Sequence, residues 1–91
     1  MDKHKLKELE EENKKLEKSC NIFYNLLIKC NIEGVRIGMN NRCTHYIYSI
    51  DGAKLKPKSK RNKLGNRLLN EFLKGKEILK NVNRLKKELN K

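Results

Sequence analysis

One spacing pattern in the first third of the chain constrains the fold more than any other feature. Apolar or small residues recur at alternating intervals of three and four from position 6 to position 30. Such intervals keep these residues on one face of an α-helix, in the heptad arrangement of helices that pack against other helices. We predict a helix over residues 1–31, because Asn31 and Gly34 then supply stop signals. The face comprises Leu6, Leu9, Asn13, Leu16, Cys20, Phe23, Leu27 and Cys30.

The partner of this helix is left open by the pattern. Asn13 falls between leucines at a position where Asn lowers stability but selects a two-stranded, in-register pair. We therefore expect a homodimer with Leu6, Leu9, Asn13 and Leu16 as oligomerisation residues. Flanking glutamates such as Glu12 would repel each other across a parallel pair, so packing against a later helix of the same or another chain is an equal alternative.

The middle of the chain, residues 34–57, is predicted to form three short antiparallel strands. Asn40-Asn41 tolerates the positive φ values of a two-residue hairpin turn, which would place Val35 opposite Tyr46. Tyr46 and Tyr48 would then lie on the apolar face of the sheet. Asp51-Gly52 predicts a second hairpin, whose third strand would end at Pro57.

A second helix is predicted over residues 60–90, with Ser59 or Asn62 as its cap. Gly75, in its middle, indicates a bend or a close approach of another element. The fold class is therefore α+β: a long helix, a three-stranded antiparallel meander and a C-terminal helix (α-β-β-β-α), with the helices pairing in coiled-coil fashion. We interpret residues 1–91 as a single small domain.

Positive charge is concentrated in the last part of the chain. The net charge is +12, and residues 54–91 contain 14 basic residues against three acids. This asymmetry is typical of proteins with a polyanionic partner. Lys outnumbers Arg by 18 to 5, which favours single contacts to phosphates over bidentate reading of base edges.

The candidate binding residues combine two sets. One set lies in the stretch that opens the second helix, and the other recurs every three or four residues along that helix. We predict that they form one continuous basic strip that contacts phosphates, with sequence-independent affinity arising from counterion release. The residues are Lys58, Lys60, Arg61, Lys63, Arg67, Lys76, Lys80, Arg84 and Lys87.

These features predict a small, non-enzymatic protein that binds DNA or RNA in an accessory or regulatory role. Its size and composition fit a protein encoded by a phage or another mobile element. The alternative is a protein-binding module or inhibitor whose basic strip docks on an acidic surface of a partner, for example a host enzyme that handles nucleic acid, because carboxylates and phosphates attract the same charges. A third interpretation is a coiled-coil assembly factor.

Other classes of function find no support in the residues. No catalytic constellation or glycine-rich phosphate loop is present, so we expect no enzymatic activity and no cofactor. Cys20, Cys30 and Cys43 are widely spaced without a Cys-x-x-Cys pair, which argues against a disulfide framework and a zinc site. The longest apolar run is three residues, far below the ~20 that span a bilayer, and we expect a cytoplasmic protein that does not bind membranes.

Overall fold

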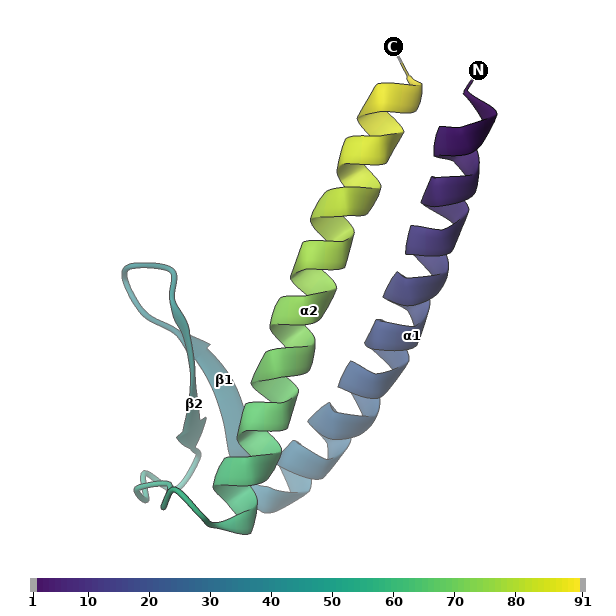
Figure 1. The fold of residues 1–91 in the computed structure, drawn as a ribbon. Helices are drawn as coiled ribbons and strands as arrows, with labels where there is room; N and C mark the ends of the chain where they lie inside the picture. Colours follow the sequence, from purple (N-terminus) through teal and green to yellow (C-terminus); the bar gives the residue numbers. More distant parts are fainter. Residues whose placement is uncertain (1, 91) are drawn as a thin grey trace.

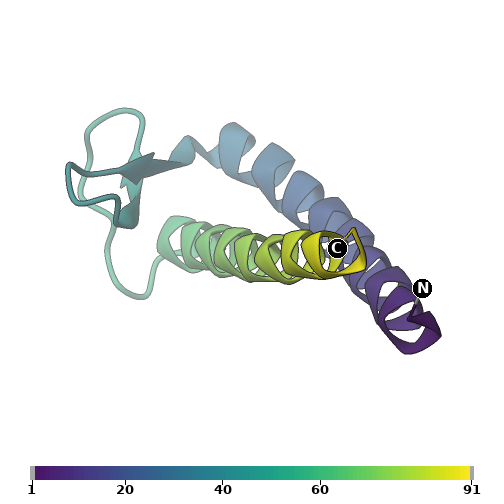
Figure 2. The same ribbon diagram turned by 90° about the horizontal axis from the view of Figure 1, so that it is seen from above.

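The computed structural model describes residues 2–90 as two long helices joined by a β-hairpin (Figure 1). The elements are α1 (Lys3–Glu33), β1 (Val35–Met39), β2 (His45–Ser49) and α2 (Lys60–Leu89). The helices lie side by side and antiparallel, which places both ends of the chain together (Figure 1). Seen from above, they cross at an angle, and the hairpin lies at the end where they separate (Figure 2). The hairpin contacts both helices, so the fold is α+β as expected.

The helix ends agree closely with those predicted, because short local signals set them. Asp2 caps α1, and its Oδ1 accepts hydrogen bonds from the N–H groups of His4 (3.0 Å) and Lys5 (3.3 Å). Gly34 ends the helix in the left-handed conformation, at φ 75°. Ser59 caps α2, and its hydroxyl accepts a hydrogen bond from the Asn62 N–H at 3.2 Å.

The register of the hairpin differs from the prediction. Val35 pairs with Ser49, and Ile37 with Ile47, because three residues rather than two form the tip of the loop. Asn40 holds this longer loop: its side-chain oxygen accepts hydrogen bonds from the N–H groups of residues 42 and 44, at 2.9 and 3.0 Å. Cys43 adopts the left-handed conformation, at φ 63°, that such three-residue loops require.

A change of register by an odd number of residues exchanges the two faces of a strand. Ile47 therefore packs against the core, and Tyr46 and Tyr48 point outward with 46% and 40% of their surfaces exposed. The prediction that the tyrosines lie on the apolar face was wrong. The Asn40 side chain holds the three-residue loop, and this loop length allows Ile47 to pack on the core.

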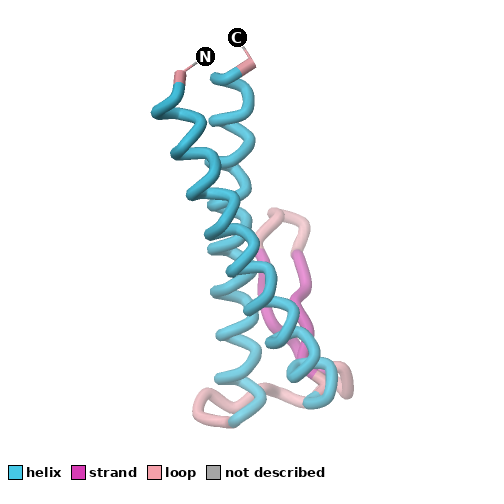
Figure 3. The backbone as a smooth tube through the Cα atoms, turned by 90° about the vertical axis from the view of Figure 1, so that its right-hand side faces the viewer, coloured by secondary structure: helices cyan, strands magenta, loops and turns pink. Residues whose placement is uncertain are grey.

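The predicted third strand does not form, because the chain after Ser49 follows a different route. Asp51-Gly52 does make a turn, in which the Gly52 N–H donates to the Ser49 carbonyl at 3.1 Å. The side chain of Asp51 then binds the Ala53 N–H and Arg61, which directs the chain toward α2 instead of back along β2. Residues 50–59 are consequently a loop, drawn in pink in Figure 3. Leu55 within this loop packs on the core.

The core is concentrated at the hairpin end of the helix pair. A buried cluster there comprises Leu26, Cys30, Val35, Leu64 and Leu68. Toward the other end, Ile78, Val82 and Leu85 of α2 are buried in the helix pair. The helices therefore pack against each other within a single chain, and the hairpin covers one part of that pair.

The face that α1 turns toward α2 is displaced from the predicted seam. Ser19 is buried and donates to Glu71 Oε1 of α2 at 3.0 Å, while the neighbouring seam residue Cys20 is exposed. Leu9 and Leu16 are half-buried, whereas Leu6 and Asn13 are exposed. One edge of the predicted seam thus remains on the surface of the helix pair.

Candidate functional site

A basic groove lies between the C-terminal end of α1 and the N-terminal end of α2. It is a hollow of about 780 Å³, and four of the nine predicted binding residues line it together with one lysine of α1. The lining residues, which define the basic groove, are Lys29, Ile32, Glu33, Lys58, Lys60, Lys63, Leu64 and Arg67.

Positive charge in the basic groove is largely uncompensated. Its one acid, Glu33, forms an ion pair with Lys60, whose Nζ lies 3.2 Å from Oε1. Across residues 2–90, no carboxylate pairs with the other four cations of the groove, Lys29, Lys58, Lys63 and Arg67. The start of α2 adds the positive end of a helix dipole at the same place. The groove therefore attracts anions that carry more than one charge.

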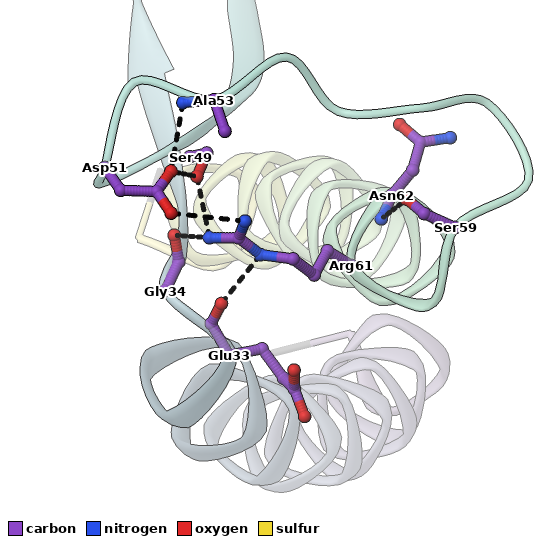
Figure 4. A network of polar contacts seen from close by, with 8 residues as sticks. All are labelled: Glu33, Gly34, Ser49, Asp51, Ala53, Ser59, Arg61 and Asn62. Atoms are coloured by element: carbon purple, nitrogen blue, oxygen red, sulfur yellow. Dashed lines mark hydrogen bonds and ion pairs between the residues drawn. The ribbon is translucent and has the colours of Figure 1, made fainter.

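Arg61 has a structural position beside the groove rather than in its lining. Its Nε donates to the Glu33 carbonyl at 2.9 Å, and its Nη2 donates to the Gly34 carbonyl at 3.3 Å and to Ser49 Oγ at 2.7 Å (Figure 4). Its Nη1 lies 3.5 Å from Asp51 Oδ2. One guanidinium thus joins the end of α1, the end of β2 and the start of α2, which fixes the two walls of the basic groove.

The electrostatics of Asp51 follow from this arrangement. Hydrogen bonds from the Ser49 hydroxyl and the Ala53 N–H, together with the charge of Arg61, hold the pKa of the Asp51 carboxyl below its usual range. Asp51 is therefore ionised at neutral pH and neutralises part of the charge of Arg61. Of the predicted binding residues near the loop, Lys60 and Arg61 both face a carboxylate, and Arg61 is in addition hydrogen-bonded to two backbone carbonyls and a hydroxyl.

The remaining predicted residues form a separate group on the C-terminal half of α2. Lys80, Arg84 and Lys87 border a second hollow, and Arg84 pairs with Glu88 at 3.1 Å. Lys76 lies over the ring of Phe72, 5.7 Å from its centroid.

This group is distant from the basic groove in two respects. From Arg67, the last residue of the groove, to Lys76, the first residue of the group, the helix rises by ~14 Å. The group also lies on the face of α2 that is opposite the buried residues Ile78, Val82 and Leu85. The structure therefore divides the predicted strip into two separate basic surfaces.

One functional candidate escaped the sequence analysis. Lys29 lies about 30 positions before Lys58 in the chain, and only the packing of the two helices brings it to the groove. The sequence indicated only that Lys29 lies in the last turns of α1, close to Gly34. That position becomes informative only when the direction of the second helix is known.

The described residues offer no site for a metal ion, since no group of three His, Cys, Asp or Glu side chains comes together in positions 2–90. Cys30 is buried, which raises the pKa of its thiol, and Cys20 and Cys43 are exposed. Neither helix, within these same positions, has the length and apolar character needed to cross a membrane.

Comparisons with protein families, with characterised proteins and with solved structures found no match to this chain.

Proposed function

We propose that this protein is a non-enzymatic nucleic-acid-binding protein that holds phosphates in the basic groove. The observation that carries the proposal is the group of four cations, Lys29, Lys58, Lys63 and Arg67, that surround the groove without an acidic partner in residues 2–90. A phosphate backbone presents regularly spaced charges that several such cations bind at once. Each contact releases condensed counterions, which makes binding favourable at low salt and weaker as salt rises.

The composition of the groove also defines the kind of recognition. Lysine supplies compact charges without the bidentate geometry that reads base edges. The proposal is therefore sequence-independent binding, suited to an accessory or regulatory protein. We also propose the cytoplasmic location expected from the sequence, where nucleic acid is accessible.

The experiment compares two triple variants that remove equal charge from the two basic surfaces. The first, Lys58→Gln with Lys63→Gln and Arg67→Gln, changes the basic groove. The matched control, Lys76→Gln with Lys80→Gln and Lys87→Gln, changes the C-terminal half of α2. Fluorescence anisotropy with labelled random-sequence DNA and RNA, at several salt concentrations, gives the affinity and its salt dependence.

We expect the groove variant to lose at least about tenfold in affinity at low salt, and its log–log salt slope to become shallower by about two. The control should lose much less. Equal losses in both variants would show that net charge, not the groove, determines binding. No binding by the parent protein at low salt would refute the proposal and favour the alternative, an acidic surface on a partner protein.

We also propose that two copies of the chain associate in coiled-coil fashion through the exposed edge of the helix pair. Leu6 of α1 and Leu79 of α2 are 38% and 46% exposed, and Asn13 and Cys20 lie exposed on the same predicted seam. A dimer would bury this edge and would double the number of basic grooves. Light scattering should give a mass near twice 10.8 kDa, and a single-chain mass at all concentrations would contradict self-association.

A further inference from the structure

The outer face of the hairpin carries an aromatic surface that the basic groove does not explain. Tyr46 and Tyr48 project from β2 on this face, with 46% and 40% of their surfaces exposed. Their ring centroids are 6.0 Å apart and the rings are tilted by 48° to one another. Two neighbouring exposed aromatic rings form an apolar patch of the kind that marks binding surfaces.

The sheet holds one of these rings in a defined position. Gly38 lies directly opposite Tyr46 in the antiparallel pair. A Cβ atom added to Gly38 would lie 2.7 Å from Cζ of the Tyr46 ring, so the ring rests on the bare backbone of β1. Tyr46 therefore does not need to be ordered by a ligand, which lowers the entropic cost of binding to its exposed side.

Positive charge links these rings to the basic groove. Arg36 pairs with Tyr48 across the strands and therefore projects from the same outer face. Lys54 lines a hollow of about 600 Å³ beside both tyrosines, and Lys58, on the same loop, lines the basic groove. Three residues separate the two lysines, so their Cα atoms are at most ~14 Å apart.

We propose that Tyr46 and Tyr48 form a stacking surface for unpaired bases, so that the nucleic acid bound by this protein is single-stranded. This inference rests on the proposed function, because it assumes that the basic groove holds the phosphates of the same strand. Bases in a duplex are stacked and paired, and their flat faces are not accessible to side chains on a sheet. An unpaired base presents that face, and aromatic side chains bind it with little preference for sequence.

The spacing of the rings agrees with a strand of this kind. The 6.0 Å between the centroids is well above the ~3.4 Å rise between stacked bases. Two successive bases on these rings are therefore separated from one another, as in an extended single strand. The acid near this face, Asp51, pairs with Arg61 and so repels the strand less than a free carboxylate.

Tyrosine fluorescence provides a direct test, because the chain has three tyrosines and no tryptophan. Tyr24→Phe removes the third tyrosine, which lies on α1 with 63% of its surface exposed, and leaves only Tyr46 and Tyr48 as emitters. The probes are a twelve-nucleotide oligothymidylate and a twelve-base-pair duplex. We expect saturable quenching with the single strand and tighter binding of the single strand than of the duplex.

A double variant and its conservative counterpart assign the effect to the rings. Tyr46→Leu with Tyr48→Leu should weaken binding of the oligothymidylate about tenfold or more and leave duplex binding unchanged. Tyr46→Phe with Tyr48→Phe keeps both rings, and should bind like the parent. Quenching in the Tyr24→Phe protein tests the same contact in a chain whose hairpin is intact, so the outcome does not depend on folding of the leucine variant.

The possible failures can be distinguished. Equal affinity for the single strand and the duplex, without quenching and without an effect of the leucine variant, would overturn the stacking surface and leave the proposed function standing. Absence of binding of either probe at low salt would overturn the proposed function and this inference with it.

Discussion

Replacing Arg61 with Met is the perturbation that best separates a structural arginine from a binding one. The basic residues around Arg61 in the sequence predict that it contacts phosphates. In the structure its guanidinium donates three hydrogen bonds, at 2.9, 3.3 and 2.7 Å, to α1, to the glycine that ends it, and to β2. Met keeps the aliphatic stem and a high helix propensity, so the change removes chiefly the polar contacts.

The size of the effect follows from these contacts. At ~1 kcal/mol net for each hydrogen bond, the three together contribute ~3 kcal/mol. The side chain is 29% exposed and the Gly34 carbonyl also accepts the Ile50 N–H at 2.8 Å, so water and existing partners compensate in part. We expect the free energy of unfolding to fall by ~2 kcal/mol, out of the ~5–10 kcal/mol typical of a domain of this size. The corresponding fall in Tm is ~8–16 °C.

Urea unfolding followed by circular dichroism measures this change, and Lys63→Met is its matched control. Lys63 lies two residues further along α2, is exposed, and has no carboxylate partner within residues 2–90. The control should leave stability within about 0.5 kcal/mol of the parent but weaken nucleic-acid binding. The Arg61 variant should lose stability, but should bind nucleic acid like the parent under conditions where it is folded. Unchanged stability of the Arg61 variant, with weakened binding, would refute the structural role assigned to it.

Three further predictions use stability as the readout. Gly75→Ala should stabilise the protein by ~0.5–1 kcal/mol, since the added Cβ lies 3.5 Å from its nearest neighbour, an ordinary contact. Gly65→Ala should give no gain or a loss, because its Cβ would lie 2.8 Å from two core side chains. Equal effects of the two changes in thermal unfolding would contradict the packing of α2. Cys43→Gly should stabilise by ~0.5 kcal/mol by relieving its left-handed conformation, and a loss in urea unfolding would argue against the three-residue loop. The Asp51→Asn variant should be less stable than the parent at pH 6. Because the pKa of Asp51 is lowered in the folded protein, this difference in stability should shrink as the pH falls below ~3.9, the usual pKa of Asp. A constant difference in stability down to pH 3 would refute the Asp51 contacts.

The helices could be predicted because their signals are local. Asp2, Gly34 and Ser59 act on backbone groups within a few residues, so their effect is visible in a short window of sequence. The apolar spacing of both helices likewise depends only on helical geometry. The two helices and their approximate bounds followed from signals of this kind, and strand alternation with Asn40-Asn41 predicted the antiparallel hairpin.

The faces that these elements present were decided by tertiary contacts. Asn40-Asn41 is compatible with a two-residue and a three-residue loop, and the packing of half-buried Ile47 on the core agrees only with the second. The third strand failed for a similar reason. Asp51 contacts Arg61, ten positions later, and that contact redirects the loop.

The candidate site shows the same division. Charge composition alone predicted a polyanionic partner and four of the cations that line the groove. Lys29 joined them only when the two helices packed, whereas the separation of Lys80 and Lys87 from them follows from the rise and the faces of α2 itself. Sequence determines which residues are charged and which segments are helical, because those properties are local. Which charges share a surface depends on the direction of helices and the register of strands, and contacts between distant residues set both.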